Sequence, residues 1–509
     1  MGCLLYPEGM LPMPGNIPDQ TTEDLQLERL AAFMSWTHYL KISAAELNAL
    51  WTEDPAVISH RQAVLREILV NPELGKALDM LLGCIDGWEG RAGGIRRGLD
   101  NMAVGINMTD FGNLDSYIKK LDAVYNELGK FSFRSAGMKA LYEKLGSMRC
   151  SERFENVKKS FEALCRGYAA PKLMRLGFNL DGELKLSAYK LLYMEQYTGE
   201  EEKKSKKRKL WFTQKAMETN NMLLQRSVQS ASQAIGAFVS RETMEFRSVK
   251  KDLIFFLSLG KLCRAWEEKG LKWCFPKLCP VSEKAFAVKD MFNPLLVVGG
   301  RETIITNDIE LKKGGEILVL TGANQGGKTV FLLSTALTQW LFQLGAAVPC
   351  ESAQISPVSG IFTVFSPNNT EHKTRGLLAE EAQRIANVVS SVKENSMVLF
   401  NEPLTSTSPS ETKSISLDVI AAFKAVGMHG VWVTHIHELA SERSKIEAAI
   451  PWGSSLGSIR IVMDRTGDES VFTYKVERAE PEFNSYASEV LRRKGVTLGA
   501  LHSHEITDI

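Results

Sequence analysis

The 509-residue sequence predicts a multidomain protein, with an all-α N-terminal region followed by an α/β domain. Residues 19–275 contain only three prolines and are rich in Leu, Ala, Lys and Glu, so most of this stretch can form helices. From about residue 281, short apolar runs rich in β-branched residues alternate with helical stretches, which is typical of an α/β domain. We therefore expect an N-terminal extension over 1–18, a helical region over 19–280 and an α/β domain over 281–509.

The overall composition excludes several classes of protein. Lys and Arg number 61 against 60 Asp and Glu, so no global charge would draw this chain to nucleic acid, and any DNA contact must be local. The eight cysteines form no CxxC pair and have no histidines at zinc spacing, which favours reduced thiols and a cytoplasmic location. The sequence has neither the pattern of a signal peptide nor an uncharged stretch of about 18 residues, so we expect no membrane association.

Two features stand out in the predicted helical region. Thr21 and Asp24 have the spacing of a capping box ahead of an apolar stripe. Residues 177–194 combine a glycine turn with partial apolar alternation, which predicts a short hairpin, and a basic tract follows at 203–209. A solvated loop or helix face is the ordinary interpretation of this tract, and a contact with the DNA backbone is the alternative.

The α/β domain is defined by its expected strands. Apolar runs at 316–321, 397–400 and 431–433 each have the length and composition of a buried strand. Near the end of the chain, residues 458–464 and 470–476 flank a short turn and predict a β-hairpin, before a final helix around 485–494.

A glycine-rich loop between the strand at 316–321 and a helical stretch predicts a phosphate site. Glycines let backbone N–H groups point at phosphate oxygens, and the following helix N-terminus adds positive partial charge. Lys328 is expected to neutralise the β- and γ-phosphates, and Thr329 to bind magnesium. The predicted cofactors are thus ATP and Mg²⁺, held by the loop residues Gly322, Ala323, Asn324, Gln325, Gly326, Gly327, Lys328 and Thr329.

Two further strands bring candidate catalytic groups to the same sheet edge. The strand at 397–400 delivers Asn401, in the place where an aspartate usually holds the magnesium shell, and Glu402, which could orient or deprotonate the attacking water. The strand at 431–433 leads to His435, which could sense the γ-phosphate and assist catalysis. The alternatives are a surface carboxylate at Glu402 and an ordinary core histidine at His435.

These blocks together resemble the MutS family of DNA mismatch-repair ATPases, whose nucleotide domain is of the ABC class. TGANQGGKT is similar to the family's TGPNMGGKS, VLFNEPLTSTS to VLLDELGRGTS, and VTHIHEL to ATHYHEL. The stretch GAAVPCESAQISPVSGIFTVF resembles the segment between these motifs, and the spacing of the blocks agrees. The resemblance is strong over residues 290–495.

Outside this stretch the resemblance suggests how the remaining segments are used. VISHRQAVLREIL (57–69) resembles a helix of the MutS core, so residues 19–280 would form the core and lever regions. The hairpin and basic tract at 177–209 would then stand where the family has its DNA clamp. Ser485-Tyr486-Ala487 and the following VLRRKGV resemble the family's C-terminal helical segment, which implies docking on a partner subunit.

Four departures from the family pattern qualify what can be carried over. The Phe-x-Glu wedge that reads mismatches has no counterpart outside Phe400-Asn-Glu402. Asn401 replaces an aspartate, which predicts weaker magnesium binding and slow hydrolysis. The family's trans-acting SGRST motif corresponds to HKTRG, with Gly376 in place of a serine. Ile304 falls where the family stacks a Phe on adenine, and so becomes the expected base contact.

The sequence thus suggests a homodimer that sandwiches ATP between two ABC-class domains. ATP binding would change the angle of the helical arms, which would grip branched DNA or another irregular duplex through its backbone rather than read mismatches. Two other functions stay open. One is a nucleotide-gated scaffold with little or no hydrolysis, suggested by Asn401 and Gly376, and the other is an ABC-class ATPase that acts on a protein partner.

Overall fold

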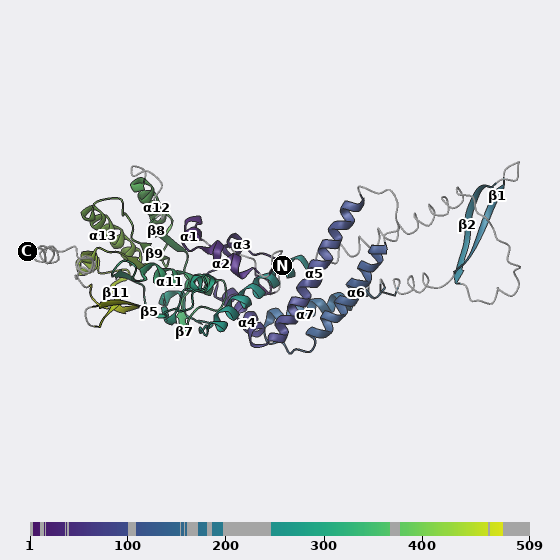
Figure 1. Ribbon diagram of the computed structural model, residues 1–509, viewed down its shortest axis with the longest axis horizontal. Coiled ribbons are helices and arrows are strands. Elements are labelled where there is room, and N and C mark those ends of the chain that lie inside the picture. The colour runs from purple at the N-terminus through teal and green to yellow at the C-terminus, as the bar shows by residue number, and fades with distance from the viewer. Residues whose placement is uncertain are drawn as a thin grey trace, which may run out of the picture. The chain divides into compact units, whose positions relative to one another are not determined.

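The computed structural model describes residues 4–99, 108–159, 172–180, 186–196, 246–366, 377–466 and 469–481, apart from positions 11–14, 16, 36, 38, 39, 153 and 157. The chain divides into two compact units (Figure 1). The helical unit consists of Met1–Leu4 and Val70–Leu253, and the sheet unit of Leu5–Leu69 and Ile254–Ile509. Residues 19–69, which we expected in one region with the rest of 19–280, thus pack with the C-terminal part of the chain.

The helical unit is built on three long helices. Helix α6 packs against both of the others, and the aromatic rings of Tyr125 on α6 and Tyr142 on α7 stack with their centroids 4.7 Å apart. Asp122 on α6 pairs with Arg149 at 2.6 Å and with Lys158 at 3.2 Å, and these cations lower the pKa of the Asp122 carboxyl despite its partial burial. The helices are α5 (Pro72–Leu99), α6 (Met108–Leu128) and α7 (Ala136–Arg149).

The helical unit also contains the predicted interruption. Strands β1 (Lys172–Leu180) and β2 (Leu186–Gln196) pair antiparallel, which confirms the strand pairing expected around 177–194. An entirely helical N-terminal region is therefore too simple a description. The basic tract at 203–209 lies outside the described residues.

Four helices near the N-terminus belong to the sheet unit, except for Val70 at the end of the fourth. They are α1 (Asp19–Asp24), α2 (Leu27–Met34), α3 (Ala44–Leu50) and α4 (Pro55–Val70). Helix α1 lies along strand β8 (Ile361–Phe365), where the Thr21 hydroxyl donates to the carbonyl of Ile361 and the Thr363 hydroxyl donates to the Asp24 carboxylate. The predicted capping box is wrong, because Pro18 is the N-cap of α1 and Thr21 instead bonds across to the sheet.

A six-stranded sheet forms the centre of the sheet unit. Its order is β12-β11-β6-β10-β9-β8, and all neighbours are parallel except the antiparallel pair β11 and β12. The predicted strands and the C-terminal hairpin are confirmed, as β6 (Glu316–Thr321), β9 (Met397–Asn401), β10 (His429–Val433), β11 (Ser455–Thr466) and β12 (Glu469–Arg478). The expected final helix at 485–494 lies outside the described residues.

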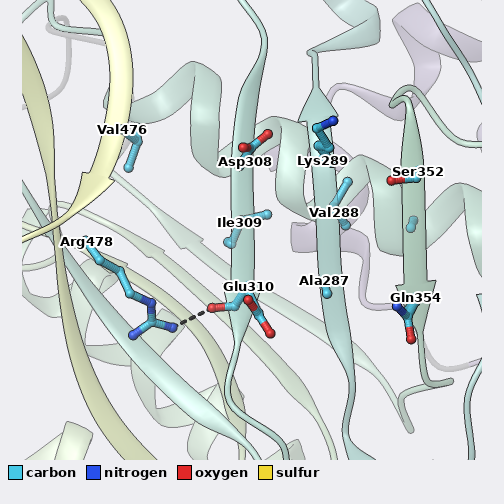
Figure 2. A pocket seen from close by; sticks show the side chains of 11 residues that line it. Ala287, Val288, Lys289, Asp308, Ile309, Glu310, Ser352, Gln354, Val476 and Arg478 are labelled. Carbon is cyan, nitrogen blue, oxygen red and sulfur yellow. Dashed lines mark hydrogen bonds between the residues drawn. The ribbon is translucent and has the colours of Figure 1, made fainter.

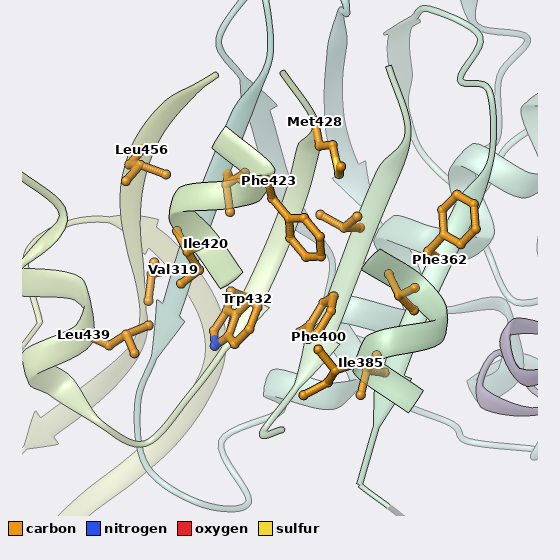
Figure 3. Packing of buried hydrophobic residues seen from close by; sticks show 14 of the residues in the cluster. Val319, Phe362, Ile385, Phe400, Ile420, Phe423, Met428, Trp432, Leu439 and Leu456 are labelled. Carbon is orange, nitrogen blue, oxygen red and sulfur yellow. The ribbon is translucent and has the colours of Figure 1, made fainter. Parts of the chain in front are cut away.

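Helices cover both faces of this sheet. On one face, α12 (Leu377–Ser391), α13 (Pro409–Val426), α14 (His437–Ser441) and α15 (Arg443–Ala449) enclose an apolar cluster (Figure 3). Its centre is Phe400, whose ring stacks on Trp432 with centroids 4.4 Å apart and meets Phe423 edge-on. Because strand side chains alternate between faces, the intervening strand residues face the other way, where α11 (Lys328–Gln343) contacts β9 and β10. The predicted α/β domain is thus confirmed.

A second, four-stranded sheet has the order β3-β7-β4-β5. Its strands are β3 (Lys277–Leu278), β7 (Ser352–Ile355), β4 (Phe286–Met291) and β5 (Asn307–Leu311), accompanied by the 3-10 turn Val281–Glu283 and α10 (Pro294–Val298). An open groove of about 450 Å³ runs over three of these strands beside β12 (Figure 2). Its lining carries two cations, Lys289 and Arg478, and two carboxylates, Asp308 and Glu310, so the groove presents little net charge.

No helix in the described part of the chain is both long and apolar enough to cross a membrane.

A buried histidine makes the sheet unit sensitive to acid. His429 lies at the start of β10, and neither ring nitrogen has a hydrogen-bond partner among the described residues. Burial, with a smaller effect from the charge of Lys284, lowers the pKa of His429 to about 4. Because this folded-state pKa lies below the ordinary 6.5, the neutral ring stabilises the fold above pH 6.5, and that stability is lost as the pH falls toward 4.

We predict that His429 contributes about 2 kcal/mol to the loss of unfolding free energy between pH 7 and pH 5, at about 1.4 kcal/mol per unit below pH 6.5, and that His429→Leu removes this contribution. Urea unfolding at the two pH values measures it. His435→Leu, at an exposed position, serves as the control and should retain the wild-type pH dependence. An equal loss of stability in His429→Leu would contradict the assignment.

Candidate functional site

The predicted phosphate loop lies at the carboxyl ends of three neighbouring parallel strands. Val433 on β10 is paired with Leu320 on β6 on one side and with Asn401 on β9 on the other. The segments that follow these strands therefore emerge at the same sheet edge. This edge is where ligands bind in open α/β sheets.

Two glycines allow the loop to lie close against its neighbours. Gly322 has a φ of 145°, and a Cβ atom there would lie 2.8 Å from the Cβ of Ile461 on β11. Gly327, the N-cap residue of α11, has a φ of 94°, and a Cβ there would lie 3.2 Å from Cδ1 of Tyr474. Side chains at these positions would strain the backbone and displace the neighbours, so the turn into α11 depends on glycine.

Lys328 is held at the centre of the site. Its side chain is only 5% exposed, and Nζ donates to the carbonyl oxygens of Gly322 at 2.8 Å and Ala323 at 3.4 Å and to Oδ1 of Asn324 at 3.2 Å. The same ammonium lies 3.1 Å from Oε1 of Glu402. The structure thus brings together Lys328 and Glu402, which are 74 residues apart in the sequence and which the sequence patterns assigned to one site.

A second contact links the same two segments. The exposed hydroxyl of Thr329 donates to Oδ1 of Asn401 at 3.2 Å. These are the two residues that we expected at the magnesium. Their oxygens are neutral, and the described residues contain no cluster of three or more His, Cys, Asp and Glu side chains that could hold a metal ion. A divalent cation would fit here only together with phosphate oxygens and water, which is the usual way that Mg²⁺ binds at nucleotide sites.

Glu402 sits in a strained turn directly after β9. Its φ is 49°, a conformation that non-glycine residues rarely adopt. Its backbone N–H donates to the carbonyl of Val433, and the hydroxyl of Ser366 donates to its carbonyl oxygen at 2.6 Å. These bonds fix the backbone, so the Glu402 carboxylate points at Lys328.

Two histidines follow β10, and they differ in environment. His435, our candidate sensor of the γ-phosphate, is exposed in the turn between β10 and α14. His437 is half-buried, and burial is the main cause of its lowered pKa, with the charge of Lys328 also contributing. His437 therefore lies within electrostatic reach of the phosphate lysine. His437 was not selected from the sequence, because His435 was chosen as the first histidine after the strand at 431–433.

Tyr474 is a second residue that sequence reasoning missed. It lies on β12 beside Gly327, is 47% exposed, and has a φ of 56°. A register shift between Val462 and Met463 on β11 accompanies this turn in the strand. The Asn307 side chain bridges the Tyr474 carbonyl and the Val476 N–H, which joins β12 to β5. The sequence pattern of the hairpin predicts a strand at Tyr474, but it does not indicate that this side chain lies beside Gly327 in the glycine loop.

Ile304, the expected base contact, is half-buried in the segment before β5. Two residues later, the carbonyl of Thr306 accepts a hydrogen bond from Nζ of Lys475, the residue that follows Tyr474. The segment that carries Ile304 and the strand that carries Tyr474 are thus joined next to the loop. Whether Ile304 itself contacts a base stays a prediction.

The mainly parallel sheet, the glycine turn into a buried helix, and the paired Lys328 and Glu402 define an α/β domain of the P-loop class. Residues 318–503 match the family model "MutS domain V". This part of the chain is accordingly a domain of the MutS domain V type.

Proteins named MutS are also similar to part of this chain. The DNA mismatch repair protein MutS of Prochlorococcus marinus (strain MIT 9301) is 24% identical over 270 residues, which cover 51% of this chain and 28% of that protein. MutS of Acetivibrio thermocellus is 27% identical over 218 residues, covering 42% of this chain and 24% of the relative. MutS of Chlorobaculum parvum is 26% identical over 256 residues, covering 50% and 28%. The matched part thus spans about a quarter of the length of these relatives.

The position of Tyr474 leads to a prediction about nucleotide binding. Tyr474→Ala should weaken binding of ADP about tenfold, because stacking of a base on an aromatic ring contributes about 1–3 kcal/mol. Tyr474→Phe keeps the ring and should bind ADP like the wild type. Calorimetric titration measures both, and tripolyphosphate, which has no base, should bind all three proteins equally. An equal loss of tripolyphosphate binding in Tyr474→Ala would mean that the loop itself is disturbed.

Proposed function

We propose that this chain binds and hydrolyses ATP with Mg²⁺ and acts as a nucleotide-controlled switch of the MutS type. The observation that carries the proposal is the meeting of Lys328 and Glu402, 3.1 Å apart, at the end of a glycine loop. The contact between Thr329 and Asn401 supports it, since both oxygens lie at the same edge of the sheet. ATPase activity is also what the family assignment leads us to expect.

In this proposal each residue has a distinct task. Lys328 neutralises phosphate charge, and the loop backbone with the N-terminus of α11 binds phosphate oxygens. Glu402 orients the attacking water and accepts its proton, while one of the histidines after β10 contacts the γ-phosphate. Thr329 and Asn401 would hold the magnesium ion, which supplies positive charge to the phosphate oxygens when bound. Ile304 and Tyr474 would contact the base.

Asn401 favours slow turnover. An amide oxygen can accept a hydrogen bond from a metal-bound water but contributes no negative charge, so magnesium should bind more weakly than beside an aspartate. The same observation supports a second candidate, a scaffold that binds nucleotide and hydrolyses little or none of it. Whether the chain is an ATPase or a scaffold, ATP binding would change how two copies of the chain associate.

We further propose that the functional form is a homodimer that closes on ATP and acts on DNA in the cytoplasm. The relatives are named DNA mismatch repair proteins. The basic tract at 203–209 lies before the residues 318–503 that match MutS domain V. Backbone contacts through such a tract suit branched or otherwise irregular DNA, because they depend on shape and charge rather than base sequence. An ATPase of the same class that acts on a protein partner is the alternative.

The first test compares wild type with Glu402→Gln. We expect ATP turnover to fall about 100-fold or more, because general base catalysis typically contributes about that much. The variant should still bind ATP, and its size-exclusion mass should double in the presence of ATP. Glu394→Gln, at a side chain that is 79% exposed, is the control and should turn over ATP like the wild type. Equal, background-level rates in wild type and Glu402→Gln would exclude the enzyme and favour the scaffold.

The second test concerns DNA. Forked duplex should be retained more strongly than plain duplex at low salt, and replacing the six Lys and Arg residues of 203–209 by Gln should reduce the salt slope by up to about 5. The control is the double variant Lys76→Gln and Lys130→Gln, which removes two exposed cations of the helical unit and should change little. Absence of salt-dependent binding to either duplex would favour a protein partner.

A further inference from the structure

Helix α12 carries a carboxylate in its apolar stripe. The buried residues of this helix are Glu381, Ile385 and Val388, spaced four and three residues apart on one face. Ile385 and Val388 belong to the apolar cluster under the sheet (Figure 3), yet Glu381 is only 2% exposed in the same row. A buried carboxylate is costly unless it is fully hydrogen-bonded, so its partners indicate why it is there.

Four hydrogen bonds hold the Glu381 carboxylate, and their donors belong to two adjacent residues of the loop that follows β9. Oε1 accepts from the backbone N–H of Thr405 at 3.3 Å and from its hydroxyl at 3.0 Å. Oε2 accepts from the N–H of Ser406 at 3.3 Å and from its hydroxyl at 2.5 Å. Each carboxylate oxygen thus binds one backbone and one side-chain donor of the loop.

This loop begins with Glu402 and has an unusual backbone. Glu402 and Leu404 both have positive φ values, 49° and 62°. Two non-glycine residues in this region persist only when surrounding contacts hold them. On the far side of the loop, the Thr412 hydroxyl donates to the carbonyl of Leu404 at 2.8 Å, and Leu404 itself is buried in the apolar cluster. Glu381 holds the next two residues, Thr405 and Ser406, through its four hydrogen bonds.

We propose that Glu381 is a positioning residue for hydrolysis, whose buried carboxylate fixes residues 403–406 so that Glu402 faces Lys328. The inference rests on the proposed ATPase function. The four hydrogen bonds of Glu381 go to Thr405 and Ser406, and none goes to Lys328 or to the loop at 322–327. Glu381 therefore affects catalysis through the backbone that carries Glu402. Phosphate and base binding should not depend on it.

The test uses Glu381→Gln, because an amide has one acceptor oxygen and cannot serve both donor pairs. We expect kcat for ATP to fall about tenfold, equivalent to about 1.4 kcal/mol of activation free energy, while the Kd for ADP changes less than about twofold. Amide hydrogen exchange at Thr405 and Ser406 should quicken, which is a readout independent of turnover. Glu380→Gln, the adjacent exposed carboxylate that pairs with Arg384, is the matched control and should behave as wild type.

Ser406→Ala provides a milder second variant in case Glu381→Gln does not fold. It removes the 2.5 Å hydroxyl donor and should lower kcat by about threefold with ADP binding unchanged. An unaltered kcat in a folded variant with quickened exchange would overturn the inference, as would a parallel loss of kcat and ADP binding, which indicates a structural role only. Wild-type turnover no faster than Glu402→Gln would instead overturn the proposed function.

Discussion

The burial of helix α11 is the constraint on which the site depends. Of its 16 residues, 14 are buried, and Thr329 is one of the two that reach the surface. At its carboxyl end, the buried guanidinium of Arg61 on α4 donates to the carbonyl of Leu344, where positive charge complements the helix dipole. Gln343 is bonded to the backbone of Thr52 and Val358. A helix held in this way cannot turn or slide, so its N-terminus presents Lys328 and Thr329 at a fixed place.

The sequence was most informative where the signal is local. A strand, a glycine loop and a helix in direct succession predict the position of Lys328, and the apolar run before Asn401 predicts a parallel strand beside it. Because parallel strands of an α/β sheet end at the same edge, the meeting of Lys328 and Glu402 followed from these patterns alone. The same holds for the hairpin β11 and β12, whose two alternating runs flank a turn.

Contacts between residues far apart in the chain could not be predicted from the sequence in the same way. Thr21 and Asp24 fit a capping box, but a strand 340 residues away offers the hydrogen bonds that they make instead. Nothing in the residues around Tyr474 shows that a bulge carries it to Gly327. Glu381 did leave a signal, since a carboxylate four residues before Ile385 interrupts an apolar stripe, but its partners in the loop after β9 could only be found in three dimensions.

The pairing of α1 with β8 has a consequence for how this protein is made. Residues 5–69 are synthesised well before residue 361, so Thr21 must wait for Ile361 before it can bond to the sheet. The intervening helical unit can fold during that interval, since domains generally fold as units while synthesis proceeds. The leading segment, with its apolar faces on α2 and α4, stays unpaired for most of translation. Nascent chains should therefore depend on chaperones at this stage more than the buried contacts of the finished sheet unit suggest.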